Sequence, residues 1–182
     1  TRTSSLTRTL DVTETFLDLY GVPNAPEMEK FSLLSMRCGE QRREAALFGY
    51  FGGAVNITDG RYTYHLFPED LARQEIYQYT VMPTHIWEPF SPEELSTATL
   101  AAPFSFSKGV PLLKVAVTDR SPMYNNYGPG ALLESDTRLY DLSSDPGQQH
   151  PISDPLVEAR LRQMMAGLMR TNDAPAEAFS RL

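Results

Sequence analysis

The sequence predicts an α/β chain of α+β type, in which a small antiparallel sheet carries a packed C-terminal helix. Two patterns lead to this prediction. Short runs rich in β-branched and aromatic residues are separated by turn residues, and a long amphipathic segment closes the chain. Composition agrees, because 41% of the 182 residues are hydrophobic and 21% are charged, as is ordinary for a globular protein with one main core.

The first predicted element is a short amphipathic helix over residues 11–20, with acidic residues near its start and a Gly-x-Pro sequence after it. A helix of about ten residues is marginal by itself in water, so we expect its apolar face to dock on another surface. Residues 23–44 are expected to form a loop with one short apolar stretch, residues 31–36. The apolar face of the helix consists of Val12, Phe16, Leu19 and Tyr20.

The middle of the chain predicts a strand, a tight turn and a second strand. Residues 45–57 are dense in β-branched, aromatic and glycine residues, Asp59-Gly60 follows, and residues 61–67 alternate in character. Glycines inside the first run indicate bends or a close approach of two backbone segments. Further strands are expected at residues 104–107, 112–117 and 137–142, and a loop at residues 121–130.

Two segments carry signals for the start of a helix. Ser91-Pro92 has the residue types of an N-cap and a first helical position, so a short helix is expected over residues 92–97. Asp154-Pro155 opens the clearest helix of the chain, and its apolar stripe should lie across one face of the sheet. This stripe contains Val157, Leu161, Met164, Met165 and Leu168.

Composition argues against several classes of partner. Sixteen Lys and Arg residues stand against 23 Asp and Glu residues, so the formal charge is -7, and cationic residues do not cluster as a nucleic-acid or anionic-membrane surface requires. No apolar run approaches the ~18 residues of a membrane span. The single cysteine, Cys38, excludes an intrachain disulfide. The chain begins at Thr1 and not at methionine, which leaves room for an upstream domain or leader, and the compartment stays open.

A complete catalytic site is not expected within this chain. Its three histidines lie far apart in sequence, and no nucleophile, phosphate-loop or metal-ligand motif stands near them. His85 and Trp87 combine a hydrogen-bonding ring with a stacking surface on an irregular segment, which is typical of sugar-binding sites and also of loop anchors. His65 fits a hydrogen-bonded sheet position or a ligand contact, and Lys108 fits a solvent-facing charge or an anion contact. The candidate substrate-binding residues are therefore His85, Trp87, His65 and Lys108, with no catalytic residue and no metal ligand.

Three motifs, taken in order, resemble the C-terminal third of bacterial sulfatases, which belong to the alkaline-phosphatase superfamily. The helix LDVTETFLDLYGVP is similar to the family's helix after the last catalytic-domain strands. The run ALFGYFGGAVNITDGRYTYHLFP carries the family's TDGRY signature, and TRLYDLSSDP is similar to its LYDL and DP close. The resemblance extends over about residues 9–182.

The resemblance implies both a domain division and a function. Residues 1–60 would form the C-terminal edge of the sulfatase catalytic domain, and residues 61–182 the C-terminal subdomain that shapes the substrate cleft. The whole enzyme, a sulfuric ester hydrolase, would act on a sulfated small molecule or glycan with a formylglycine nucleophile and calcium or a similar divalent metal. In the family these groups lie upstream, and Cys38 does not fit the nucleophile pattern. The chain alone is therefore expected to hold no cofactor, to be inactive, and to have the upstream catalytic domain as its partner.

Two alternatives stay open. The first is the same region of a phosphonate monoester or phosphodiester hydrolase of this superfamily, which differs from a sulfatase mainly upstream. The second is a non-catalytic interaction or assembly module, in which the first and last helices would form the contact surface.

Overall fold

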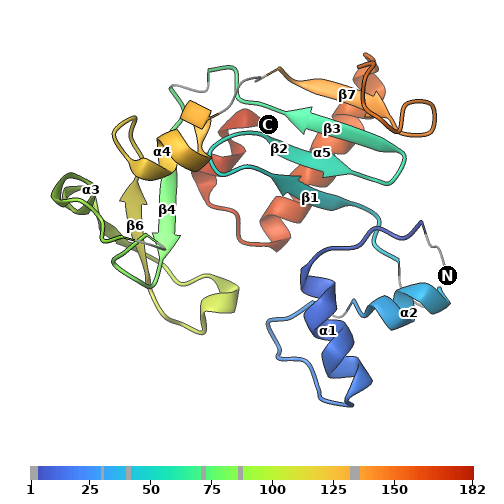
Figure 1. The fold of residues 1–182 in the computed structure, drawn as a ribbon, viewed down its shortest axis with the longest axis horizontal. Coiled ribbons are helices and arrows are strands. Elements are labelled where there is room, and N and C mark those ends of the chain that lie inside the picture. The colour runs from blue at the N-terminus through green and yellow to red at the C-terminus, as the bar shows by residue number, and fades with distance from the viewer. Residues whose placement is uncertain (1–3, 30, 40–41, 71–72, 86–87, 132–135) are drawn as a thin grey trace. The chain divides into compact units, whose positions relative to one another are not determined.

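The computed structural model describes residues 4–29, 31–39, 42–70, 73–85, 88–131 and 136–182 (Figure 1). The chain forms two compact units, each assembled from segments that are separated in sequence. Unit 1 contains Thr1–Phe48, Asn56–His65 and Thr137–Leu168, and unit 2 contains Gly49–Val55, Leu66–Asp136 and Met169–Leu182. The α+β class is confirmed, because the chain has two small antiparallel sheets and a C-terminal helix. The predicted division at residue 60 concerns an intact enzyme and stays a prediction.

A four-stranded sheet dominates unit 1. Its strands are β1 (Ala46–Gly49), β2 (Val55–Thr58), β3 (Tyr62–Leu66) and β7 (Arg138–Asp141), in that spatial order. Strands β3 and β7 run antiparallel, with Tyr62 opposite Asp141 and Tyr64 opposite Leu139. The segments that carry the TDGRY and LYDL motifs are therefore neighbouring strands, although residues 67–137 separate them in sequence.

The run over residues 45–57 folds as two strands and not as one. It turns back between β1 and β2, where a Cβ on Gly49 would collide with the carbonyl oxygen of Ala54. The close approach of two backbone segments that the glycines predict is therefore confirmed at Gly49. The predicted Asp59-Gly60 turn is confirmed as well, since the amide of Asp59 donates to the carbonyl of Tyr62 and Gly60 has a φ of +89°.

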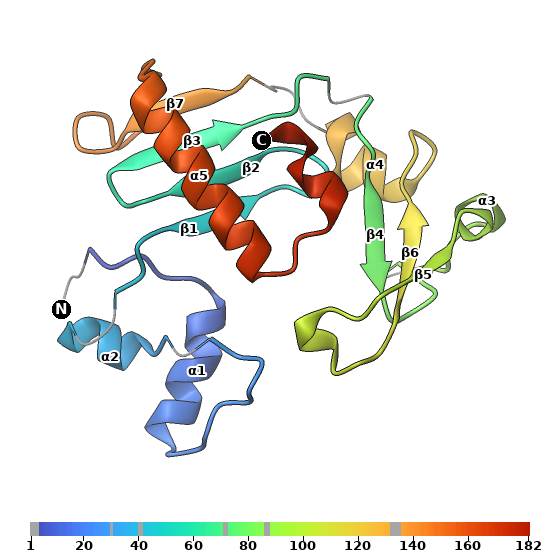
Figure 2. The ribbon, with the colours of Figure 1, turned by 180° about the vertical axis from the view of Figure 1, so that it is seen from behind.

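Helix α5 (Pro155–Thr171) crosses one face of the four-stranded sheet, as Figures 1 and 2 show from opposite sides. This position confirms the prediction for the terminal helix. The carboxylate of Asp154 accepts the first free amides of the helix, those of Leu156 and Val157. Leu161 and Met165 are fully buried, as the apolar stripe requires.

Two short helices precede the sheet in unit 1. Helix α1 (Leu10–Leu19) confirms the first prediction, whereas α2 (Leu33–Cys38) replaces part of the expected loop. Helix α2 has six residues, too few for a hydrophobic period, and its ends are fixed by caps. The hydroxyl of Ser32 accepts the amide of Leu34, and Gly39 ends the helix with a φ of +77°.

Unit 2 contains a three-stranded antiparallel sheet in the order β4 (Tyr77–Thr80), β6 (Leu112–Ala116), β5 (Thr99–Ala101). The central strand β6 was predicted, and the two short outer strands were not. Val115 at the centre of β6 is fully buried. The sheet aligns Tyr79 with Lys114 across β4 and β6, a pairing that matters for a pocket described below.

Two expectations for unit 2 were wrong. Residues 104–107 do not form a strand, since Ser105–Ser107 make a 3-10 turn that ends at Lys108 with a φ of +54°. The expected loop over residues 121–130 contains a helix that begins at Ser121-Pro122. The prediction of a helix over residues 92–97 is confirmed. The helical elements of unit 2 are α3 (Pro92–Ser96), η1 (Ser105–Ser107), α4 (Pro122–Tyr127), η2 (Pro129–Ala131) and η3 (Ala176–Arg181).

Candidate functional site

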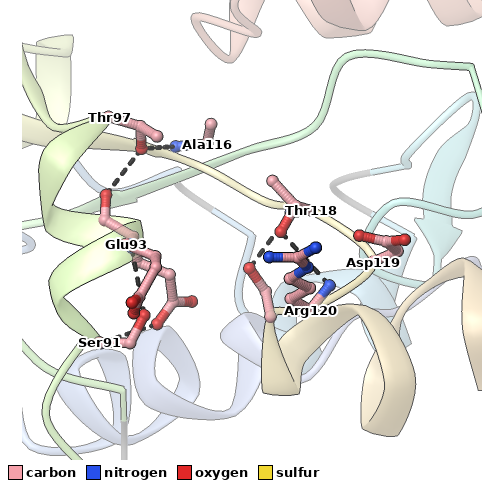
Figure 3. Close-up of a pocket in the computed structure, with 9 residues that line it drawn as sticks. Ser91, Glu93, Thr97, Ala116, Thr118, Asp119 and Arg120 are labelled. Carbon is pink, nitrogen blue, oxygen red and sulfur yellow. Dashed lines mark hydrogen bonds between the residues drawn. The ribbon is translucent and has the colours of Figure 1, made fainter.

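A polar cleft of about 630 Å³ lies in unit 2, between α3 and the loop that follows β6 (Figure 3). Hydroxyl and carboxylate groups dominate its lining, together with one guanidinium group. The cleft contains the ionic partner of His85, which is the first of the predicted binding residues. Side chains that line it include Glu93, Glu94, Thr118, Asp119, Arg120 and Ser121.

Glu94 occupies this cleft because it closes the N-terminus of α3. The hydroxyl of Ser91 accepts the amide of Glu94 at 3.1 Å, and the Glu94 carboxylate accepts the amide of Ser91 at 3.0 Å. This reciprocal capping box turns the carboxylate back toward the start of the helix. There it meets Nε2 of His85, which lies 3.1 and 3.2 Å from its two oxygens.

The Glu94 carboxylate is stabilised in its ionised form. Burial by itself would raise its pKa, but hydrogen bonds from the Ser91 amide and His85 outweigh burial and lower the pKa. The hydroxyl of Ser121, which is 1% exposed, accepts the amide of Thr118 and lowers the Glu94 pKa further.

His85 is held as part of this cluster and not as an open binding residue. Only 9% of the residue is exposed, and its ring packs edge-on against Phe90 with centroids 4.5 Å apart. Its Nδ1 atom is buried and has no hydrogen-bond partner within the described part of the chain. Trp87, predicted beside it, lies outside the described residues.

The two remaining predicted residues have other surroundings. His65 lies on β3 in unit 1, where Nε2 is 3.0 Å from the side-chain oxygen of Gln148 and the ring contacts Phe48 and Tyr140 edge-on. Lys108 is exposed at the end of η1 in unit 2. His65 thus occupies the hydrogen-bonded sheet position that was one of its two interpretations. A common cleft for His65, His85 and Lys108 stays a prediction.

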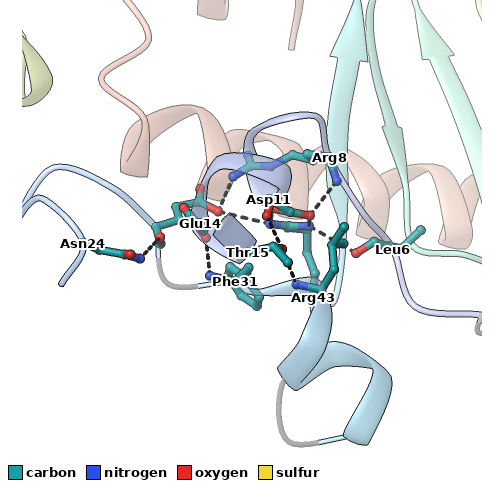
Figure 4. A network of polar contacts seen from close by, with 10 residues as sticks. Leu6, Arg8, Asp11, Glu14, Thr15, Asn24, Phe31 and Arg43 are labelled. Carbon is teal, nitrogen blue, oxygen red and sulfur yellow. Dashed lines mark hydrogen bonds and ion pairs between the residues drawn. The ribbon is translucent and has the colours of Figure 1, made fainter. Parts of the chain in front are cut away.

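In unit 1 a polar network buries the polar face of α1 (Figure 4). An ordinary amphipathic helix buries its apolar face instead. The carboxylate of Asp11, which is 1% exposed, accepts two hydrogen bonds from the guanidinium of Arg43, at 2.7 and 2.8 Å. Burial would raise the pKa of Asp11, but Arg43 and the amide of Arg8 lower it overall. Nearby, Glu14 accepts the amide of Phe31, and burial raises the pKa of its carboxyl group. These contacts tie the polar face of α1 to the following loop.

The apolar face of α1 consequently faces outward. Phe16 is 57% exposed and Leu19 is 61% exposed, and both belong to the stripe that was expected to dock on another surface. Helices of globular proteins normally bury such a stripe. Val12, Phe16, Leu19 and Tyr20 form this surface, which we call the α1 apolar face.

The residues of the TDGRY motif stabilise the four-stranded sheet and the helix that crosses it. Asp59 accepts the amides of Arg61 and Tyr62 at 2.9 and 2.7 Å, and its other oxygen is 2.6 Å from the guanidinium of Arg160 on α5. Burial would raise the Asp59 pKa, but these bonds lower it. Arg61 pairs with Asp141 of the LYDL motif at 3.3 Å. The motif residues therefore hold turn, strand and helix together.

Sequence reasoning missed the partners of the buried charges. The Ser-x-x-Glu spacing at residues 91–94 is a signal for the capping box, but nothing in it points to His85. Arg43 stands 32 positions from Asp11, and only the tertiary structure joins them. Within the described residues, no group of three His, Cys, Asp or Glu side chains is arranged to hold a metal ion. Likewise, no helix in the described part of the chain is long and apolar enough to cross a bilayer.

Comparison with known proteins adds no family assignment. No protein-family model matches the chain, and no curated protein matches its sequence.

Proposed function

We propose that this chain is the C-terminal portion of a bacterial sulfatase, a sulfuric ester hydrolase whose catalytic domain lies upstream. The order and spacing of three sulfatase-like motifs support the proposal. Two of these motifs, on β3 and β7, are adjacent strands of one sheet, which gives a structural reason for their joint occurrence. In the intact enzyme this portion contributes to the wall of the substrate cleft.

The observation that carries the proposal is the orientation of α1, whose polar face points inward and whose apolar face points outward. Its polar face is fixed inward by the buried Asp11–Arg43 pair, while the α1 apolar face is left open. Monomeric proteins rarely leave contiguous apolar surfaces of this kind uncovered. An upstream catalytic domain would cover this surface, since the matching family helix follows directly on that domain.

Catalysis in the proposed enzyme would depend on groups outside this chain. A formylglycine nucleophile and calcium, or a similar divalent ion, would supply the attacking oxygen and the charge that stabilises the sulfate oxygens. The polar cleft around Glu94 contains a carboxylate that is already bonded to Ser91 and His85. The role of His85, Trp87, His65 and Lys108 in substrate binding remains part of the proposal.

The α1 apolar face also favours a second candidate, a non-catalytic interaction or assembly module. The mass of the chain in solution separates the two candidates. An assembly module would form an oligomer of fixed size over a wide concentration range, because its apolar face would pair with a second copy. A severed domain would be monomeric, or would associate without a defined stoichiometry.

The proposed reaction is tested on the parent polypeptide with matched aryl esters. We expect it to hydrolyse 4-nitrophenyl sulfate faster than 4-nitrophenyl phenylphosphonate, and to lose this activity when EDTA removes the metal. A faster reaction with the phosphonate would identify the phosphonate hydrolase instead. Hydrolysis of neither ester, together with a stable oligomer, would leave the assembly module as the function.

A further inference from the structure

A second pocket, of about 490 Å³, lies in unit 2 beside the C-terminal segment. It differs from the cleft around Glu94 in its lining, which is mostly apolar and aromatic with a few charged groups. Small-molecule sites usually have this composition, because apolar walls provide contact and a few polar groups fix orientation. The residues that matter for the argument are Tyr79, Phe104, Phe179, Arg170, Asp173 and Glu177.

The aromatic wall of this pocket is held rigidly. The hydroxyl of Tyr79 donates to the carboxylate of Glu177 at 2.5 Å, and the Tyr79 ring lies 5.3 Å from that of Phe104. Phe104 in turn lies 5.3 Å from Phe106, whose ring is tilted by 32° to it and whose residue is 55% exposed. A fixed aromatic surface thus continues from the pocket onto the open surface of η1.

The charges around the pocket cancel. Lys114 lies 3.1 Å from Glu177 and 3.9 Å above the ring of Tyr77, so this carboxylate is already neutralised. Burial would raise the Glu177 pKa, but Tyr79 and Lys114 lower it. The remaining pair consists of Asp173, which accepts the amide of Ser105 at 2.6 Å, and Arg170, which is exposed beside Phe179. Among the described residues, Lys114 and Arg170 balance Glu177 and Asp173, so these four groups carry no net charge with which to select an ion.

We propose that this pocket binds an uncharged sugar ring. The C–H face of a pyranose is apolar and packs against aromatic side chains, while its hydroxyls both donate and accept hydrogen bonds. Arg170 supplies a pure donor and Asp173 a pure acceptor at the pocket rim, which matches hydroxyls better than a sulfate or an ammonium group. Among the described residues that line the cleft around Glu94, carboxylates are in excess and none is aromatic, so these residues lack this combination.

Proline-rich peptides also bind grooves lined by aromatic residues. The pocket is less suited to them, because the Tyr79 hydroxyl is committed to Glu177 and is not free to bond a peptide carbonyl. The sugar proposal uses only residues of unit 2 and does not rest on the sulfatase proposal.

The test is a titration of the 15N-labelled 182-residue chain, followed by NMR, with three uncharged hexasaccharides: cellohexaose, laminarihexaose and mannohexaose. We expect at least one to bind saturably and to shift the amides of residues 104–106, 173–174 and 176–179. Arg170→Ala and Asp173→Asn should each weaken this binding about tenfold, the usual effect of losing a hydrogen bond to a charged group. Arg120→Ala, an exposed arginine in the other cleft, is the matched control and should leave the affinity unchanged.

Several outcomes would overturn the proposal. One is the absence of saturable binding by all three sugars at 10 mM, with the fold intact in the NMR spectrum. Equal weakening by Arg120→Ala and Arg170→Ala would move the site out of this pocket. Tighter binding of a chondroitin sulfate hexasaccharide or of a proline-rich peptide at the same amides would replace the uncharged sugar with an anionic sugar or a peptide.

Discussion

Asp11 and Glu94 are buried acids whose charges are balanced by residues elsewhere in the chain. Glu94 is bonded locally by Ser91 and more distantly by His85, whereas Asp11 depends on Arg43. Local spacing predicts the first of these contacts, because a capping box is a pattern within four residues. The other two contacts arise from chain folding, and no periodicity or motif in the sequence encodes them.

Replacing Asp11 by Ala should strongly destabilise unit 1, because it leaves the guanidinium of Arg43 buried without its carboxylate. We expect the free energy of unfolding to fall by about 3–5 kcal/mol, as for other broken buried ion pairs. Urea denaturation at pH 7 measures the change. Asp18→Ala on the exposed side of the same helix is the matched control, and it should stay within about 0.5 kcal/mol of the original chain.

The effect of Asp11→Ala should also depend on pH. The pKa of Asp11 is lowered in the folded chain, so its contribution is complete above its usual pKa of 3.8 and disappears as the pH falls through the lower folded value. The difference between the original chain and the variant should therefore shrink on acidification. A difference that is constant from pH 7 to acid would contradict an ionised Asp11–Arg43 pair.

His85 tests the link between the buried cluster and substrate binding. If His85 contributes to the substrate cleft, His85→Ala in the parent enzyme should lower kcat/KM for the natural substrate. The loss should correspond to ~1–3 kcal/mol of transition-state stabilisation, the cost of leaving a binding partner unsatisfied. Activity on a small aryl sulfate should stay nearly unchanged. His150→Ala, in an exposed turn, is the control. Equal losses on both substrates, or none on either, would make His85 only an anchor for α3.

At the scale of helices and strands, the sequence predicts elements that carry their own signals. The Asp59-Gly60 turn, the Ser91 cap and the Asp154-Pro155 start all appear where expected. Helices α2 and α4 were missed because six residues show no hydrophobic period; α2 is defined by its two caps, and α4 begins with a proline. The strand expected at residues 104–107 was wrong because a short apolar run does not distinguish a strand from a 3-10 turn.

Two glycines should respond to alanine in opposite directions. Gly60 needs its φ of +89°, so Gly60→Ala should lower the free energy of unfolding by about 1–2 kcal/mol, although space for the methyl group exists. Gly167 lies in α5 with open space around it, so Gly167→Ala should raise stability by about 0.5–1 kcal/mol. Urea denaturation of both variants measures the shifts. Changes of the same sign would contradict the assigned backbone conformations.

At the scale of the whole molecule, hydrophobic patterning located the helix α1 correctly but not its orientation. The pattern identifies an apolar face, and the usual rule turns that face inward. Here the Asp11–Arg43 pair fixes the opposite face, so the apolar side chains are available for another surface. The sequence does not show either that each unit combines distant segments, because β3 and β7 pair although residues 67–137 separate them.

Phe16 should matter only when the upstream domain is present. In the isolated chain it is exposed, so Phe16→Ala should change the free energy of unfolding by less than about 0.5 kcal/mol. In the parent enzyme, where we propose that Phe16 is buried, the same change should cost about 3 kcal/mol or more. Leu156→Ala, at an 84% exposed position of α5, is the control in both proteins. Equal small effects of Phe16→Ala in both proteins would mean that no upstream domain covers α1.

We propose that this chain belongs to a sulfatase but has no sulfatase activity by itself. The test is the rate at which the purified 182-residue chain releases 4-nitrophenol from 4-nitrophenyl sulfate, measured beside the parent enzyme and a buffer blank. We predict the blank rate for the chain and metal-dependent turnover for the parent, because the nucleophile and the metal are proposed to come from the upstream domain. Turnover by the chain alone, or a parent that does not hydrolyse the ester, would contradict the claim.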